Sequence, residues 1–465
     1  MNVTETLAYI HGRPKGGKKN SMARMTALLQ KLGHPEDKLP ATFHVTGTNG
    51  KGSTSTMLSS IGQADGKRVG LFTSPYIVQF NDRFQINGED ISDKDLILYT
   101  ERVRAEADQV AADSAGELIP TEFEVVTAIM FCYFAENALD LAVIEVGIGG
   151  LYDSTNLLQS TAVSVVTSVA LDHEALLGDS LTAISKQKAG IIKNGKPVVV
   201  GPHLPKEALS VVRETAAGLD SPVIVAGETS GRRADGSRYV HALAGSFQED
   251  NMQTAVAAYK ALYPDTDEDV IQEGLSEAFL PGRFEHVLVA EENVEHVLVA
   301  EEDVERGQNH DDGAQEGGSA KDCQVDVYLD GAHNPNGLAA LKDTLNEQFG
   351  LPDGLEDGAR DGNKKDVEVI VCAAGLADKH LVEGLKPLAL DKNIQLVTVD
   401  YAGLPGRPAL AKEAYENAGF TDLTFPNLDQ VLKYANKQGK PLVFTGSLYF
   451  ISDVRRHLCQ TKKKF

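Results

Sequence analysis

A glycine-rich segment at residues 44–53, HVTGTNGKGS, is the strongest candidate for chemistry in the chain. It stands between an apolar run that predicts a buried strand and a pattern that predicts a helix. A glycine-rich turn at such a place lets backbone N–H groups point at a phosphate, aided by the positive end of the helix. Lys51 can reach terminal phosphates and the Ser53 hydroxyl can meet a magnesium ion, although the literal P-loop spacing is not met. A purely structural turn is the alternative, and the flanking elements favour phosphate binding.

Five further polar candidates follow apolar runs or a predicted boundary, and the carboxyl edge of a parallel sheet is where such folds bind ligands. Glu145, just before GIGG, could be a hard oxygen ligand for Mg²⁺ or a solvent-exposed carboxylate at a strand end. His173, in LDHE, could be a ligand or a hydrogen-bonded structural residue. Asp330 and His333, in DGAHNP, could orient a ribose and approach a phosphate, or form an ordinary turn. Arg283, in PGRFE, could clamp phosphate or pair with an acidic neighbour.

Two more positions have weaker signals. Ser74, in TSP, follows a predicted strand and precedes residues 76–88, which are too irregular for a helix or a strand. A loop of this length is usually functional or disordered, and a mere surface excursion is the equal alternative. Lys188 lies on a predicted helix, and taken alone it would be a surface lysine.

The elements that must position these residues alternate between strands and helices. Short Val- and Ile-rich runs without polar alternation predict strands buried on both faces, at residues 42–46, 69–73, 141–146, 162–169 and 197–201. Helical patterns lie between and after them, at residues 53–64, 93–112, 121–137, 181–194 and 251–263. This order predicts an α/β fold with a mostly parallel sheet.

The pattern restarts after residue 320 as a second, smaller α/β unit of Rossmann-like type. Its predicted strands are residues 325–330, 367–373, 394–400 and 441–445, and its predicted helices are residues 336–348, 379–390, 409–417 and 428–438. A helical pattern ends on Leu280-Pro281-Gly282, which marks a boundary. We therefore predict an N-terminal domain of residues 1–280 and a C-terminal domain of residues 281–465.

Two segments depart from this order. Residues 285–294, EHVLVAEENV, recur as EHVLVAEEDV at residues 295–304, so either a hairpin or one strand with a spare copy is expected. Residues 304–322 and 352–365 are acidic and rich in Gly, with few apolar side chains. Such segments bury too little surface to offset their ordering entropy, and we expect mobile insertions.

Composition excludes several classes of function. The chain has 465 residues, with 44 Lys and Arg against 67 Asp and Glu, a net charge of −23 that repels phosphate backbones and anionic lipid. We therefore expect no nucleic-acid or membrane partner. Four widely spaced cysteines form no CxxC pair, which argues against zinc or disulfide frameworks. The N-terminus lacks an apolar signal-peptide core and no apolar run reaches 18 residues, so a soluble cytoplasmic protein is expected.

Taken together and in order, the motifs resemble the folylpolyglutamate synthase/dihydrofolate synthase family of the Mur ligase superfamily, most closely its lactobacillus-type folylpolyglutamate synthases. The resemblance rests on HVTGTNGKGS, FTSPYIVQFNDRF, TEFE, EVGIGG…DSTN, LDHEALLGDSLTAISKQKAGII, FQEDNMQTAVAAY, PGRFE, DGAHNP and FTGSLY. It implies an ATP-binding, Mur-ligase-like domain at residues 1–280 and a glutamate-ligase domain at residues 281–465.

The resemblance also implies a role for each candidate residue. The phosphate loop and the ATP contacts would be Asn49, Gly50, Lys51, Gly52, Ser53, Asn251, Arg283, Asp330 and His333. Two Mg²⁺ ions would be held by Ser74, Glu145, His173 and a carbamate on Lys188, which supplies an anionic oxygen that an ammonium group lacks. The residues that carry catalysis would be Lys51, His173 and Lys188. The pterin side of the substrate would be lined by Thr121, Phe123, Glu124, Tyr152, Asp153 and Ser154.

The implied reaction is the ATP-dependent addition of L-glutamate to the terminal γ-carboxyl group of a reduced folate. Phosphoryl transfer would give an acyl phosphate that the amine of glutamate attacks, while the two domains close to keep water out. The resemblance implies small-molecule substrates and a monomer. Two alternatives stay open: a bifunctional enzyme that also joins dihydropteroate to glutamate, and a catalytically silent nucleotide-binding protein.

Overall fold

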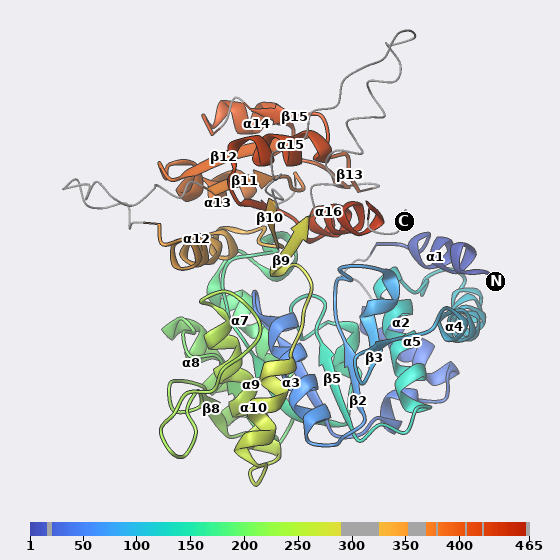
Figure 1. Ribbon diagram of the computed structural model, residues 1–465. Coiled ribbons are helices and arrows are strands. Elements are labelled where there is room, and N and C mark those ends of the chain that lie inside the picture. Colours follow the sequence, from blue (N-terminus) through green and yellow to red (C-terminus); the bar gives the residue numbers. More distant parts are fainter. Residues whose placement is uncertain are drawn as a thin grey trace, which may run out of the picture. The chain divides into compact units, whose positions relative to one another are not determined.

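The computed structural model describes residues 1–15, 21–289, 325–351, 369–377, 380–404, 407–420 and 423–461 (Figure 1). The chain forms two compact units. Unit 1 is Met1–Leu243 with Phe247–Leu280, and unit 2 is Ala244–Ser246 with Pro281–Phe465. The expected insertions at residues 304–322 and 352–365, and the second copy of the duplication, lie outside the described residues.

Unit 1 is built on an eight-stranded sheet in the order β4-β3-β2-β5-β1-β6-β7-β8. The strands are β1 (Thr42–Thr46), β2 (Val69–Phe72), β3 (Phe84–Ile86), β4 (Glu89–Asp90), β5 (Leu141–Glu145), β6 (Thr161–Val166), β7 (Val198–Val200) and β8 (Val223–Val225). The six strands from β2 to β8 in this order run parallel, and β3 and β4 are antiparallel additions at one edge. Every residue of β1, β2 and β5 is buried, as the unbroken apolar runs require. The predicted α/β fold with a mostly parallel sheet is confirmed.

Helices cover both faces of this sheet (Figure 1). Ala142 and Ile144 of β5 belong to one buried cluster, whereas Leu141 and Val143 belong to another, because successive strand residues point to opposite faces. The first cluster includes side chains of α1 (Val3–His11), α2 (Ser21–Lys31), α4 (Asp93–Asp113) and α5 (Glu122–Ala135). The second includes side chains of α3 (Lys51–Ala64), α9 (Gln248–Leu262) and α10 (Glu268–Glu277). Near β6 and β7 a further cluster holds side chains of α7 (Leu181–Ala189) and α8 (Lys206–Ala217).

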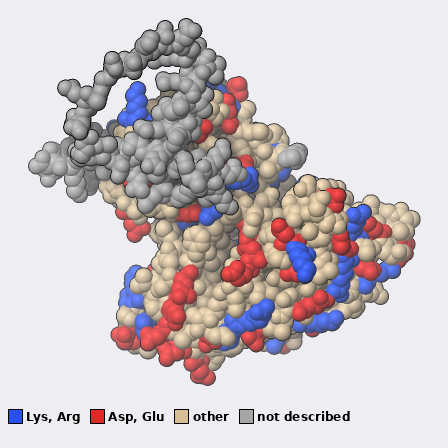
Figure 2. Space-filling model, turned by 45° about the vertical axis from the view of Figure 1, so that its right-hand side comes forward, with Lys and Arg blue, Asp and Glu red and all other residues tan. Residues whose placement is uncertain are grey.

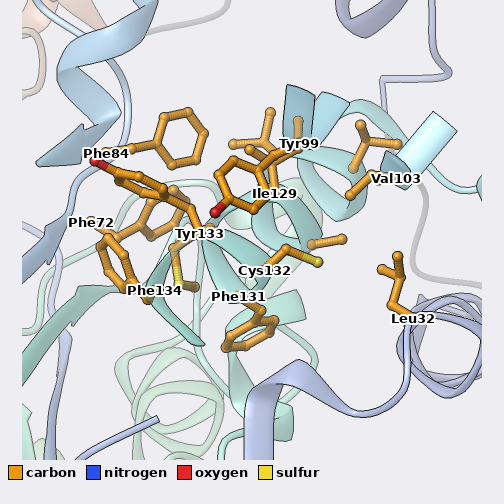
Figure 3. Packing of buried hydrophobic residues seen from close by; sticks show 14 of the residues in the cluster. Leu32, Phe72, Phe84, Tyr99, Val103, Ile129, Phe131, Cys132, Tyr133 and Phe134 are labelled. Atoms are coloured by element: carbon orange, nitrogen blue, oxygen red, sulfur yellow. The ribbon is translucent and has the colours of Figure 1, made fainter. Parts of the chain in front are cut away.

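The first cluster is rich in aromatic rings, which pack between α4, α5 and the antiparallel edge of the sheet (Figure 3). The ring centroids of Phe72 and Phe84 lie 5.6 Å apart, and those of Tyr99 and Tyr133 lie 5.5 Å apart. α5 contributes an almost unbroken series of buried side chains, including Phe131. The core therefore fixes β2, β3 and α5 with respect to one another.

Two predicted elements of unit 1 depart most from the structure. Residues 76–88 were expected to contain neither helix nor strand, yet they include a short 3-10 helix, η2 (Phe80–Arg83), and the strand β3. β3 has only three residues, too few for a periodic signal, and it is stabilised by pairing with β2. The helix expected at residues 181–194 ends at Ala189 with Gly190 as its C-cap, because the Leu151 N–H takes the carbonyl oxygen of Gln187 (2.7 Å) that a continuing helix would use.

Unit 2 is built on a six-stranded sheet in the order β15-β12-β11-β16-β10-β9. The strands are β9 (Arg283–Val289), β10 (Val325–Asp330), β11 (Val369–Ala373), β12 (Ile394–Val399), β15 (Thr424–Phe425) and β16 (Leu442–Thr445). β9, which includes the start of the first repeat copy, is antiparallel to β10, and the other pairs are parallel. The helices are α12 (Pro335–Phe349), α13 (Leu381–Ala389), α14 (Lys412–Asn417), α15 (Leu428–Gln438) and α16 (Leu448–Thr461). The strands β13 (Gly403–Leu404) and β14 (Arg407–Pro408) pair with one another in a separate antiparallel ribbon.

The surface is charged with both signs. Figure 2 shows Lys and Arg side chains interspersed with Asp and Glu side chains on one face of the molecule. Charge on this face is therefore spread out instead of gathering in one area. Among the described residues, none of the helices combines the length and the apolar character that crossing a lipid bilayer requires.

Close packing of α10 on α3 depends on Gly274. A Cβ at this position would lie 2.4 Å from the Cα atom of Ile61, and a backbone atom cannot rotate away as a side chain can. We expect Gly274→Ala to lower the free energy of unfolding by about 2 kcal/mol, measured by urea denaturation. Gly218→Ala at the end of α8 is the matched control, because its new methyl group would meet no atom closer than 3.5 Å. Equal losses in the two variants would contradict the prediction.

Candidate active site

The glycine-rich turn after β1 is held by hydrogen bonds to the segment that follows β6. The Thr48 N–H donates to the carbonyl oxygen of Ser168 (2.9 Å), and the Asn49 N–H donates to Ser168 Oγ (2.9 Å). The Thr167 hydroxyl donates to the carbonyl oxygen of Asn49 (2.6 Å). Gly47 is required here, because a Cβ would lie 1.8 Å from Thr167 Oγ1. The turn is therefore preorganised by the protein itself.

The helix α3 begins directly after this turn, at Lys51. Gly50 precedes it with a positive φ of 82°, a conformation that favours glycine. A Cβ on Gly50 would lie 2.2 Å from Asn251 Oδ1 of α9, so the turn and the Asn251 side chain approach closely. Asn251 is buried and donates from Nδ2 to Gln248 Oε1 (2.9 Å). Ser53 is buried in the first turn of α3.

Lys51, Glu145 and Ser74 come together where the neighbouring strands β1, β5 and β2 end. Lys51 Nζ lies 4.0 Å from Glu145 Oε1 and donates to the carbonyl oxygens of Gly47 and Thr48 (3.2 and 3.3 Å). The Ser74 N–H donates to Glu145 Oε2 (3.2 Å). The Glu145 side chain is 5% exposed, so its interpretation as a solvent-exposed carboxylate is wrong. Gly52 leaves room beside this carboxylate, since a Cβ there would lie 3.6 Å from Glu145 Oε2.

His173 lies beyond the strand end that the sequence predicted. β6 stops at Val166: the Thr167 N–H still donates to the carbonyl oxygen of Thr46 at the end of β1 (2.9 Å), and from there Thr167 and Ser168 bond to the glycine-rich turn, where β1 has ended. His173 has a left-handed backbone (φ 52°) before the short helix α6 (Glu174–Leu177), and its Nε2 lies 3.9 Å from Asp172 Oδ2. Asp172 and His173 thus form one polar pair at this point of the chain.

Among the residues that the structure describes, neither Glu145 nor His173 belongs to a group of three carboxylate, imidazole or thiol side chains whose ligand atoms lie close together. Within those ranges one group of three such donors has its ligand atoms within 4.8 Å of one another, and it consists of His34, Glu36 and Asp37. That group precedes β1 and so lies at the amino end of the strand, away from the glycine-rich turn. A metal at Glu145 would therefore depend on hydroxyl, phosphate or carbamate oxygens as well.

Lys188, in the last turn of α7, is buried, with 3% of its surface exposed. Burial lowers the pKa of its amine well below the ordinary value, the charge of Lys51 lowers this pKa further, and Asp172 acts in the opposite direction. The surface-lysine interpretation is therefore wrong. The structure holds a readily deprotonated amine close enough to Lys51 for their charges to interact.

Burying this amine should cost stability at neutral pH. Below the ordinary lysine pKa of 10.5, the unfolded chain binds a proton at Lys188 that the folded chain holds less readily. We expect Lys188→Met to raise Tm by about 2 °C at pH 7 in buffer depleted of CO₂, and the gain to shrink as the pH rises toward the ordinary pKa. Lys186→Met, an exposed position on the same helix, is the control. A lower Tm for Lys188→Met at pH 7 would show that the buried amine stabilises the fold.

The predicted pterin-side residues on α5 have structural partners. Thr121 caps the helix and Glu124 completes a capping box, in which the Thr121 N–H donates to Glu124 Oε2 (2.8 Å). The Glu124 carboxylate also accepts hydrogen bonds from Arg24 Nε (2.8 Å) and a terminal guanidinium nitrogen (2.9 Å) in a buried ion pair. The Phe123 ring lies against Gly147, where a Cβ would be 2.5 Å from Phe123 Cζ. Of these three residues, Phe123 is the one that reaches the loop after β5.

The second predicted pterin-side group follows the GIGG loop and is mixed in character. Tyr152 is exposed, whereas Asp153 and Ser154 are buried. The Asp153 carboxylate accepts hydrogen bonds from the Ile148 N–H (3.0 Å) and from the Thr155 hydroxyl (2.6 Å). Burial raises the pKa of Asp153 and these hydrogen bonds oppose the rise. Asp153 therefore fixes the loop from within, while Tyr152 faces solvent.

The predicted ATP contacts of the C-terminal half lie together within unit 2. Asp330, at the end of β10, is paired in register with Arg283 at the start of β9. The Asp330 carboxylate accepts hydrogen bonds from the Phe284 N–H (3.1 Å) and the Ala332 N–H (2.9 Å). Burial raises the pKa of Asp330 and the charge of Arg283 opposes the rise. His333 Nδ1 lies 2.9 Å from the carbonyl oxygen of Gly331.

Five residues that the sequence analysis did not single out take part in this arrangement. Thr167 and Ser168 hold the glycine-rich turn, and polar residues at the end of an apolar run were an available signal. Asp172 stands directly before His173. Arg24 and Arg83 carried no usable signal, because Arg24 is 100 positions from Glu124 and Arg83 donates to Ser74 Oγ across a loop.

A parallel α/β sheet with a glycine-rich turn, a lysine and a buried carboxylate at its carboxyl edge defines a class of proteins that bind phosphate groups there. No protein-family model matches the chain. Folylpolyglutamate synthase of Lacticaseibacillus casei is 33% identical, over 98% of this chain and 99% of its own length. The dihydrofolate synthase/folylpolyglutamate synthase of Bacillus subtilis is 33% identical, over 97% of this chain and 98% of its own length. A solved structure described as an FPGS–AMPPCP–folate complex matches with a TM-score of 0.74 and 31% identity, over 98% of this chain and 100% of that chain.

These full-length similarities confirm the resemblance that the motifs indicated. The chain belongs to the folylpolyglutamate synthase/dihydrofolate synthase family, whose members are ligases. It is therefore an enzyme of the ligase class. The fold of unit 1 and unit 2 is the fold of that family.

Proposed function

We propose that this protein is an ATP-dependent ligase that adds L-glutamate to the terminal γ-carboxyl group of a folate. Two relatives of nearly the same length are named for folylpolyglutamate synthesis, and a similar solved structure holds AMPPCP and folate. We further propose that unit 1 supplies the ATP site and that unit 2 supplies the glutamate-ligase part. A monomeric state and a cytoplasmic location stay predictions from the sequence.

The observation that supports this function most directly is the convergence of Lys51, Ser74 and Glu145 beside the turn at residues 47–50. A triphosphate needs backbone N–H donors and a cation, and this edge of the sheet offers both. The chain as a whole carries a charge of −23, so a local cation must work against the global field. Lys51 is held by two backbone carbonyls and is poised for that role.

In the proposed reaction, an oxygen of the folate carboxylate attacks the γ-phosphorus of ATP and the bond to the bridging oxygen breaks, releasing ADP. The neutral α-amine of glutamate then attacks the acyl carbon, the carbon–oxygen bond to phosphate breaks, and the nitrogen loses a proton to solvent, which leaves an amide and inorganic phosphate. Lys51 and the backbone N–H groups in the first turn of α3, which have no acceptor within the helix, are proposed to stabilise the charge that develops on the phosphoryl oxygens. Asn251, Arg283, Asp330 and His333 are proposed to bind the nucleotide.

The donor set fits Mg²⁺. Glu145 supplies a buried carboxylate and Ser74 a hydroxyl, which are hard oxygen ligands, and Gly52 leaves space beside the carboxylate. We propose that Glu145 and Ser74 hold one ion and that His173 and Lys188 contribute to a second. Bound there, Mg²⁺ neutralises phosphate charge and orients the triphosphate.

Lys188 fits the second role only as a carbamate, because an ammonium group repels a cation. Its lowered pKa supports this modification, since only the neutral amine attacks CO₂, losing a proton and leaving an anionic oxygen. Phe123 and Tyr152 are proposed to contact the pterin side of the substrate. Thr121, Glu124, Asp153 and Ser154 are proposed to shape the same side, through the helix cap and the buried loop described above.

A second activity is favoured by one comparison, because the relative from B. subtilis is named for dihydrofolate synthesis as well. The test is mass spectrometry of products from tetrahydrofolate and from dihydropteroate, each with ATP, Mg²⁺ and L-glutamate. A mass gain of one glutamate on tetrahydrofolate is expected, and a product from dihydropteroate would establish the bifunctional enzyme. ATP hydrolysis that ignores glutamate, with no amide product, would refute both activities and leave a nucleotide-binding protein.

A further inference from the structure

The loop between Ser74 and Arg83 has its two ends fixed to one another. β2 and β3 are antiparallel with Phe72 opposite Phe84, and the Thr73 N–H donates to the carbonyl oxygen of Arg83 (3.1 Å). The residues just inside these pairs must therefore face each other. The loop brings Arg83 back to Ser74 although nine positions separate them.

The interior of this loop is also fixed. One carboxylate oxygen of Asp82 accepts hydrogen bonds from the N–H groups of Ile77, Val78 and Gln79, at 3.0, 2.7 and 3.2 Å. Asn81 donates from Nδ2 to the carbonyl oxygen of Ile91 (2.8 Å), which anchors the loop to the chain that follows. These bonds stabilise the loop shape that returns Arg83 to Ser74.

The Arg83 residue is buried, with 8% of its surface exposed, and two aromatic rings lie near its guanidinium group. The guanidinium carbon lies 5.2 Å from the ring centroid of Tyr76 and 5.5 Å from that of Phe80. Such cation–π contacts in a desolvated place restrict the group to few orientations. In this orientation, a terminal nitrogen of Arg83 donates to Ser74 Oγ at 3.3 Å.

The hydrogen bond from Arg83 decides how the Ser74 hydroxyl can be used. A serine hydroxyl has one proton and two lone pairs, and an arginine never gives up its charge near neutral pH. Once Arg83 donates to one lone pair, the second lone pair is available to a cation and the proton to a phosphate oxygen. The Ser74 N–H is directed to Glu145 Oε2 at the same time, so backbone and side chain are both constrained.

We propose that Arg83 is a positioning residue that fixes the Ser74 hydroxyl in the orientation needed for Mg²⁺ and triphosphate. This inference rests on the proposed function, because it takes Ser74 as a metal ligand. Arg83 would act through Ser74 and would not itself contact the metal. Its removal should therefore affect Mg²⁺-dependent nucleotide binding and leave Mg²⁺-free binding almost unchanged.

The test is a double-mutant cycle read by calorimetry of AMPPCP binding at a series of Mg²⁺ concentrations, with no turnover involved. Arg83→Gln should raise the Mg²⁺ concentration for half-maximal binding about 10-fold, the usual effect of losing a residue that orients a metal ligand. In a protein that already carries Ser74→Ala, Arg83→Gln should change the Mg²⁺ concentration for half-maximal binding by less than about twofold, because the hydroxyl that Arg83 orients is absent. Arg83→Lys, which keeps a charged donor, should recover part of the loss. Arg102→Gln, which removes a surface arginine paired with Glu136, is the control.

Each other outcome overturns the inference. If Arg83→Gln raised the Mg²⁺ concentration for half-maximal binding equally in the wild type and in Ser74→Ala, Arg83 would act on the nucleotide or on the fold independently of Ser74. No effect of Arg83→Gln, or a wild type whose AMPPCP affinity ignores Mg²⁺, would also reject it. If thermal unfolding shows that Arg83→Gln is not folded, the cycle is run with Arg83→Lys, which must then show the same dependence on Ser74. Glutamate addition by the wild type is measured separately, so a failed cycle with an active enzyme leaves the proposed function intact.

Discussion

Replacing Lys51 by alanine is expected to lower kcat for glutamate addition by about 100- to 1,000-fold, the range found when one preorganised group that stabilises transition-state charge is lost. The ammonium group donates to the carbonyl oxygens of Gly47 and Thr48 and lies 4.0 Å from Glu145, which keeps its charge beside the glycine-rich turn. Its loss also leaves Glu145 with less compensating charge in a buried place. The measurement is the steady-state rate of folate glutamylation at saturating ATP.

Two variants separate the charge of Lys51 from its shape. Lys51→Arg keeps the charge but cannot place a compact ammonium group between two carbonyls, and we expect most of the loss to persist. Lys31→Ala removes a surface lysine that pairs with Asp113 and should leave kcat within about twofold. A Lys51→Ala enzyme that is folded and retains wild-type kcat would remove this residue from the mechanism.

Replacing Lys188 by glutamine is expected to lower kcat by about 100-fold and to abolish a carbamate signal. In the wild type, ¹³C-bicarbonate should give a protein-bound carbamate resonance in the NMR spectrum. The neutral amine is the reacting form, so the resonance should strengthen with rising pH and weaken as falling pH protonates the amine. Because the pKa of Lys188 is lowered by burial and by Lys51, the amine reacts at lower pH than an exposed lysine would.

The matched control is Lys186→Gln, two positions earlier on α7 and exposed to solvent. It should retain both the carbamate resonance and wild-type activity. A wild-type protein without the resonance, at a pH where it is active, would exclude the carbamate and require another ligand for the second ion. Retention of the resonance in Lys188→Gln would assign the carbamate to a different amine.

Much of the fold could be predicted because its signals are local. Fully buried parallel strands such as β1 and β5 appear as unbroken apolar runs, and helices such as α4 show their period within one segment. The prediction was poorer where a tertiary contact decides the outcome. β3 has three residues and exists through its pairing with β2, and α7 ends early where Gly190 meets Leu151.

The candidate site was predictable to the same extent. The glycine-rich turn, Glu145 at a strand end and the ordered set of family motifs could all be found in the sequence. The burial and the hydrogen-bond partners of each residue could not be found in the sequence. Lys188 had the pattern of an ordinary helix lysine, and only the structure shows its burial; likewise only the structure shows that Glu124, a predicted substrate-side residue, is paired with Arg24.

By itself the sequence determined the class of fold, the family and the set of polar groups available for chemistry, since these depend on residue types and short spacings. Only the tertiary structure decided which groups meet, which are desolvated and which are already bonded to the protein. Those properties arise from residues far apart in the chain, such as Arg24 with Glu124 or Ser74 with Glu145. Desolvation and distance set pKa values and binding capacity, and neither is a property of a residue in isolation.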